Sequence, residues 1–61
     1  MKKFMVVYEI DGVQNANFFD QSDEAESFRL EVVCGIGGHA EVYKRQRETA
    51  EELAAYEFIY S

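Results

Sequence analysis

The stretch that decides the fold is KFMVVYEIDGVQNANFFD, residues 3–20. Residues 3–10 are dense in β-branched and aromatic side chains, which favour a strand. Asp11 and Gly12 come next, and this pair supplies the positive φ angles that a two-residue type I′ turn requires. Residues 13–20 then return as a second strand. The sequence therefore predicts a β-hairpin.

A two-residue loop fixes the cross-strand partners of the hairpin. The predicted pairs on one face are Ile10 with Val13, Tyr8 with Asn15, Val6 with Asn17 and Phe4 with Phe19; those on the other face are Val7 with Ala16, Met5 with Phe18 and Lys3 with Asp20. Both faces of the first strand are thus largely apolar. We expect this strand to lie inside the sheet and to be covered on both faces. Otherwise it is covered on one face and presents an apolar, interaction-prone surface on the other.

A helix is predicted from about residue 23 to residue 34. Ser22 is the expected N-cap, the acidic residues after it suit the positive end of a helix dipole, and Gly35 is placed to end the helix in a left-handed conformation. Apolar side chains recur at helical spacing at Ala25, Phe28, Val32 and Ile36. In the competing interpretation, residues 28–32 alternate as a strand that turns through the glycines at 35–38.

The remaining chain predicts a third strand over residues 40–46 and a terminal strand over about 55–60. Residues 49–52 match a capping box, which favours a helical turn at 49–54. The whole chain, residues 1–61, is expected to form one small α+β domain of β-β-α-β-β type, with an antiparallel or mixed sheet. Two alternatives stay open: a single C-terminal helix over 50–60, and with it a four-stranded meander that ends in this helix.

Composition limits the classes of function. The 61 residues include twelve acidic and six basic side chains, a net charge of −6, and 48% are hydrophobic. This hydrophobic content can build a core, whereas the charge repels nucleic-acid phosphates and anionic lipids. We expect no direct binding to nucleic acid or membrane. One cysteine, no secretory segment and no apolar run near the roughly 20 residues that cross a bilayer predict a cytoplasmic protein.

The residues that could carry chemistry are few. Cys34 and His39 are the single thiol and the single imidazole, and they could form a nucleophile and base, or half of a metal site. A structural zinc site needs four ligands, mostly Cys and His. We expect instead that Cys34 is a buried small side chain at a helix end and that His39 is a loop residue. The sequence therefore predicts no catalytic residue, no metal and no cofactor.

Two features indicate a binding surface for a protein partner. Carboxylates gather in residues 20–31 and 48–57, and they could imitate the charge spacing of a DNA backbone in a basic groove. Four tyrosines and five phenylalanines exceed what so small a core must hold, and surfaces rich in tyrosine commonly anchor partners. The candidate partner-binding residues are Asp23, Glu24, Glu26, Glu48, Glu51, Glu52, Tyr8, Tyr43, Tyr56 and Tyr60. In the competing interpretation, the acids serve helix starts and solubility, and the tyrosines line the edge of the core.

The hairpin with its Asp11-Gly12 turn, the acidic helix start at 22–26 and the strand at 40–43 together resemble small phage-encoded accessory proteins. Many of these are host-takeover factors, such as the short acidic inhibitors of bacterial RNA polymerase. The resemblance implies a non-enzymatic inhibitor or modulator of a host nucleic-acid-processing enzyme, acting in the host cytoplasm. It has no residue-level motif, so it assigns no role to any residue. The alternative functions are a self-associating structural homodimer and a minimal enzyme or metal module.

Overall fold

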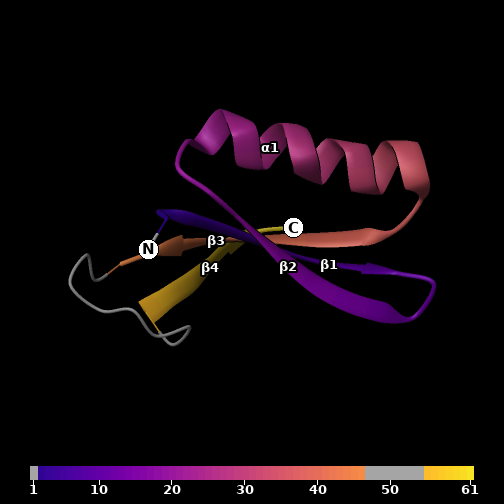
Figure 1. Ribbon diagram of the computed structural model, residues 1–61, viewed down its shortest axis with the longest axis horizontal. Coiled ribbons are helices and arrows are strands. Elements are labelled where there is room, and N and C mark those ends of the chain that lie inside the picture. The colour runs from indigo at the N-terminus through magenta and orange to yellow at the C-terminus, as the bar shows by residue number, and fades with distance from the viewer. Residues whose placement is uncertain (1, 47–54) are drawn as a thin grey trace.

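The computed structural model describes residues 2–46 and 55–61, and it forms a four-stranded antiparallel sheet with a helix across one face (Figure 1). The elements are β1 (Phe4–Ile10), β2 (Val13–Phe19), α1 (Ser22–Leu30), the π-helical segment η1 (Glu31–Ile36), β3 (His39–Arg45) and β4 (Tyr56–Tyr60). Across the sheet the strand order is β2-β1-β3-β4. The predicted α+β class is confirmed. The order of elements differs from the predicted one by η1, which stands between α1 and β3.

The strand proposed at 28–32 and the C-terminal helix proposed at 50–60 are wrong where the structure tests them. Residues 28–32 are helical, and residues 56–60 form a strand instead of a C-terminal helix. The helical turn predicted at 49–54 lies outside the described residues. Within the described ranges, no helix has the length and apolar character needed to span a membrane.

The hairpin forms as the sequence predicts. Asp11 and Gly12 have φ angles of 52° and 80°, both in the region that a type I′ turn needs. The register of β1 on β2 matches each predicted pair from Phe4–Phe19 to Ile10–Val13. Because β3 pairs with the other side of β1, the apolar first strand lies inside the sheet, as expected.

The main core lies between the sheet and the helix. Val6, Ala25, Val32, Ala40 and Val42 form its buried centre. The ring of Phe28 packs against this centre and meets two strand aromatics, Tyr8 at 5.0 Å and Phe19 at 5.4 Å between ring centroids. The helical spacing thus identified Ala25, Phe28 and Val32 correctly.

The end of the helix differs from the prediction. After Leu30 the helix widens to η1, and the N–H groups of Gly37 and Gly38 both donate to the Val32 carbonyl at 3.0 Å. Gly37, with φ 85°, closes the helix, so the prediction of Gly35 was wrong. A π-helical turn contains one more residue than an α-helical turn. The left-handed residue that ends the helix therefore comes later in the chain than predicted. The same widening turns Ile36 out of the apolar stripe, and its side chain is 60% exposed.

Gly38 holds the connection from η1 to β3 close to the hairpin. A Cβ atom at this position would lie 2.5 Å from the backbone oxygen of Glu9 and 3.2 Å from side-chain atoms of Ile10 and Val32. Only a glycine lets the chain pass here without displacing β1. This contact sets where β3 starts along the sheet.

The sheet face away from the helix is partly closed by its own side chains. Phe18 on β2 and Tyr56 on β4 lie on the two edge strands, yet their ring centroids are 5.8 Å apart. Met5, between them on β1, is buried. This face therefore holds a second, smaller apolar cluster, so both faces of β1 are covered at Met5 and Val6.

Candidate functional site

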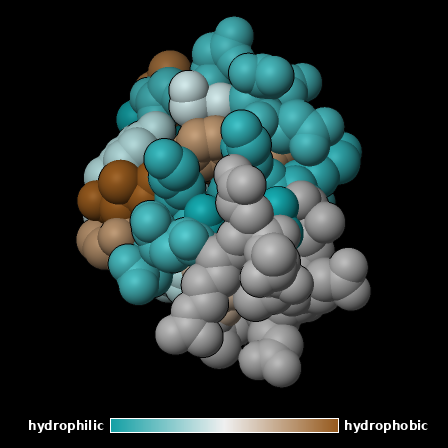
Figure 2. All heavy atoms as spheres, turned by 90° about the vertical axis from the view of Figure 1, so that its left-hand side faces the viewer, coloured by the Kyte–Doolittle hydropathy of each residue, from teal (hydrophilic) through white to brown (hydrophobic). Residues whose placement is uncertain are grey.

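The described carboxylates of the predicted binding set lie in α1, and each is engaged within the helix. Asp23 Oδ1 accepts a hydrogen bond from the Glu24 N–H at 3.0 Å, and Glu24 Oε1 accepts one from the Gln21 N–H at 3.3 Å. Gln21 is thus the N-cap, one residue before the predicted Ser22. Figure 2 shows this hydrophilic end of the molecule, with the helix start at its top. These contacts support the interpretation that the acids stabilise the helix start. The candidates outside the described residues are Glu48, Glu51 and Glu52.

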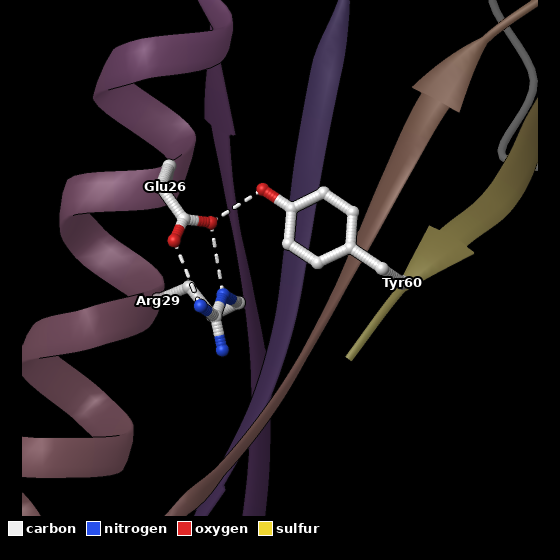
Figure 3. A network of polar contacts seen from close by, with 3 residues as sticks. All are labelled: Glu26, Arg29 and Tyr60. Atoms are coloured by element: carbon white, nitrogen blue, oxygen red, sulfur yellow. Dashed lines mark hydrogen bonds and ion pairs between the residues drawn. The ribbon is translucent and has the colours of Figure 1, made fainter.

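Glu26 belongs to a cluster that joins the helix to the last strand (Figure 3). Arg29 donates to both of its carboxylate oxygens, from Nε at 2.9 Å and from Nη2 at 2.7 Å. The Tyr60 hydroxyl donates to Glu26 Oε1 at 2.5 Å. The guanidinium carbon of Arg29 lies 5.4 Å from the centroid of the Tyr60 ring, within the range of a cation–π contact. We call Glu26, Arg29 and Tyr60 the helix–strand cluster.

A β-bulge in β4 brings Tyr60 to this cluster. Phe58 opposes Tyr43 of β3, whereas Tyr60 opposes the adjacent Val42, so Ile59 is an extra residue without a partner in the ladder. In a regular strand Tyr60 would lie on the same face as Phe58, away from the helix. With the extra residue it shares the helix face with Val42 instead.

The cluster changes the ionisation of its members. Hydrogen bonds from Arg29 and then from Tyr60 lower the pKa of Glu26 from 4.5 to about 2. The same carboxylate raises the pKa of Arg29 and that of the Tyr60 hydroxyl above their ordinary values, because both donate to it. Glu26 is therefore ionised at neutral pH, and its negative charge is balanced by the paired guanidinium of Arg29. It adds little to the negative field that the sequence predicted over residues 20–31.

The four predicted tyrosines lie in different environments. Tyr8 is half-buried against Phe28, and Tyr43 is half-buried with its ring edge-on to Phe58 at 5.8 Å. Tyr56 is buried, and its hydroxyl donates to the backbone oxygen of Lys2. Tyr60 is the most exposed of the four tyrosines, at 37%. Three of the four therefore line the edge of the core or lie within it, as in the competing interpretation, whereas Tyr60 is exposed.

Exposed apolar side chains lie on the helical segment and on the strand that the helix–strand cluster joins. On the helix, Leu30 and Val33 are 44% and 38% exposed, and at the end of β4 Ile59 is 45% exposed. Leu30 follows Glu26 by four residues and Val33 follows Arg29 by four, the spacing of neighbours on one helix face. Tyr60, which contacts both of those residues, brings β4 to the same flank. We call Leu30, Val33, Ile59 and Tyr60 the α1–β4 surface.

The sequence analysis missed Leu30, Val33 and Ile59. For the two helical residues a signal was present, since both are apolar and lie off the stripe that Ala25, Phe28 and Val32 define. An apolar residue outside the buried stripe of an amphipathic helix is a candidate for contact with a partner. For Ile59 the sequence held no such signal, because its position depends on the bulge.

A cavity of about 420 Å³ adjoins this surface. It lies where β3 extends beyond the end of β4, and its lining includes Arg29, Val33, His39, Glu41 and Ser61. The lining mixes charges of both signs with apolar side chains. Among residues 2–46 and 55–61, no group of three or more His, Cys, Asp or Glu side chains could hold a metal ion.

Cys34 and His39, the candidate nucleophile and base, lie on different elements, η1 and β3. Cys34 lies in η1, where it is an exposed free thiol, so the expectation of a buried side chain was wrong. The wide π turn, which also exposes Ile36, accounts for this exposure. His39 is the exposed first residue of β3 and not a loop residue. His39 lines the cavity described above, whereas Cys34 does not.

Comparisons with protein-family models, with curated proteins and with solved structures gave no match to this chain.

Proposed function

We propose that this protein is a non-enzymatic binding module that uses the α1–β4 surface to engage a protein partner. The observation that carries the proposal is that exposed apolar side chains stand on segments that Tyr60 joins: Leu30 on α1, Val33 on η1, and Ile59 and Tyr60 on β4. A group of exposed apolar residues rimmed by polar ones is typical of a protein interaction site. Arg29 and Glu26 provide such a polar rim here.

The acidic residues play a secondary part in this proposal. The negative charge of Glu26 is balanced by Arg29, and Asp23 and Glu24 accept hydrogen bonds at the helix start. A net charge of −6 still favours approach to a basic partner, because long-range attraction raises the rate of association. The resemblance noted from the sequence suggests a class of target to test first, a bacterial nucleic-acid-processing enzyme with a basic groove.

Capture of partners from a bacterial lysate, followed by affinity measurement with the purified partner, tests the proposal. Two double variants separate apolar contact from charge: Leu30→Ser with Val33→Ser, and Asp23→Lys with Glu24→Lys. All four positions are exposed, so neither change removes a buried contact, but the lysine variant does remove the hydrogen bonds that Asp23 and Glu24 accept at the helix start. We expect the serine variant to weaken binding by about tenfold or more, since two apolar anchors are lost. The lysine variant should mainly slow association.

The fold of each variant is checked by circular dichroism. Failure to recover a specific partner at low salt would count against the proposal. So would a partner that binds the serine variant as tightly as the original chain. If the lysine variant alone abolishes binding, binding depends on carboxylates that imitate a DNA backbone, and not on the exposed apolar side chains.

A further inference from the structure

β2 is an edge strand without the usual protection against pairing. Its seven residues, Val13–Phe19, contain no charged side chain and no proline, in a chain that is 30% charged. Residues 13–18 are all exposed. Natural edge strands are commonly blocked by charges, prolines or bulges. β4, at the other edge, carries both Glu57 and the bulge at Ile59, whereas β2 carries neither.

The hairpin determines which backbone groups of β2 are free. In a two-residue hairpin the residues that flank the turn form a hydrogen-bonded pair, and such pairs then alternate along the ladder. Ile10 and Val13 flank the turn, so the backbone groups of every second residue from Val13 point toward β1. Those of Gln14, Ala16 and Phe18 point outward. These three residues can pair with a further strand.

We propose that β2 pairs with β2 of a second copy of this chain, antiparallel about a two-fold axis at Ala16. In this register Ala16 opposes Ala16 of the second copy, and Gln14 opposes Phe18. All three residues present outward backbone groups, so each of these pairs can exchange both hydrogen bonds. The two four-stranded sheets would join into one.

The side chains also suit this register. Val13 and Phe19 lie on the helix face, because their partners Ile10 and Phe4 pack against the core there. Pairing brings Val13, which is 60% exposed, opposite Phe19 of the second copy and so extends the core. On the same face Asn15 opposes Asn17 of the second copy, and two amides can hydrogen-bond to each other.

The uncharged edge and the register favour this arrangement over other contacts between two copies. Two chains of net charge −6 repel each other, and the repulsion is least where no charged side chain lies at the contact. If the register shifted by one residue, the outward-facing backbone groups of one copy would lie opposite residues of the other copy whose backbone groups face inward. A shift by two would shorten the overlap of the seven-residue strands.

Two variants test both the contact and its register. Asn15→Lys with Asn17→Lys places like charges opposite each other twice across the axis. Asn15→Lys with Asn17→Glu places opposite charges there, at the same exposed positions. The measurement is sedimentation equilibrium across a range of protein concentrations, with circular dichroism to show that the fold is kept.

We expect the original chain and the variant N15K with N17E to form dimers. N15K with N17K should raise the dimer dissociation constant by about tenfold or more. N15K with N17K also makes the chain less negative, which lowers the overall repulsion between two copies. A weaker dimer would therefore have to come from the like charges at the contact itself. A chain that stays monomeric at all concentrations, or an N15K/N17K variant that dimerises as tightly as the original, would overturn the proposal.

This inference is independent of the proposed function, since β2 and the α1–β4 surface do not share a residue. The variant Leu30→Ser with Val33→Ser should dimerise like the original chain. Loss of dimerisation in that variant would place the contact between copies on the α1–β4 surface and would also overturn the pairing through β2.

Discussion

The hydroxyl of Tyr60 donates to the carboxylate of Glu26, 34 residues earlier in the chain, and so joins the last strand to the helix. The bulge at Ile59 makes this possible, because it moves Tyr60 to the helix face of the sheet. Glu26 in turn holds Arg29 by two hydrogen bonds. Tyr60 belongs to the surface that we propose for binding, and Glu26 and Arg29 form its polar rim.

Removal of the Tyr60 hydroxyl should raise the pKa of Glu26. In Tyr60→Phe the carboxylate loses one of its two side-chain donors but keeps Arg29, the larger cause of the low value. We expect the pKa to move up from about 2 while staying below 4.5. An NMR titration of the glutamate side chains measures it. Tyr43→Phe removes a hydroxyl from another tyrosine and should leave the pKa unchanged; an unchanged value in Tyr60→Phe would contradict the hydrogen bond.

The same carboxylate predicts a pH dependence of stability in acid. Because the pKa of Glu26 is lowered on folding, its ionised form favours the folded state. This contribution is fully present above about pH 4.5 and is lost as the pH falls toward 2. Urea unfolding of the original chain and of Glu26→Gln should therefore differ at neutral pH and converge in acid. A difference that stays constant from neutral pH to pH 2 would show that Glu26 does not act through its charge.

Gly38 and Gly35 should respond in opposite ways to substitution by alanine. A Cβ at Gly38 would collide with the Glu9 backbone oxygen, so Gly38→Ala should cost about 1–3 kcal/mol of unfolding free energy. Gly35 is helical and has no heavy atom within 4 Å of the added Cβ, so Gly35→Ala should be neutral or stabilise by up to about 1 kcal/mol. Chemical denaturation of both variants checks this. Equal effects would contradict the close approach at Gly38.

The sequence predicted the hairpin well because its determinants are local. Asp11 and Gly12 define the turn, and the turn then defines every pair from Ile10–Val13 outward. The helix end was less predictable, since the position of Gly38 against Glu9 depends on packing between distant segments. The local pattern at Gly35 therefore predicted a helix end that, in the folded protein, lies later in the chain.

The candidate site was predictable only in part, for the same reason. Glu26 was identified from its place in an acidic helix start and Tyr60 as an aromatic, but their contact depends on the extra residue Ile59. No periodicity in the sequence reveals a bulge, because a bulge is set by the pairing partner. Tyr56 was named as a candidate partner-binding residue, since composition alone does not show that its ring meets Phe18.

Cys34 should react with a thiol reagent as readily in the folded protein as in the unfolded chain, because it is an exposed free cysteine in η1. A colorimetric thiol assay in the presence and absence of denaturant measures both rates. His39→Ala is the control for the alternative function, in which the imidazole activates the thiol as a base. If the two residues act separately, the rate in the folded protein is the same with and without His39. Protection of the thiol until unfolding would contradict its exposure, and a slower reaction in His39→Ala would revive the nucleophile and base pair.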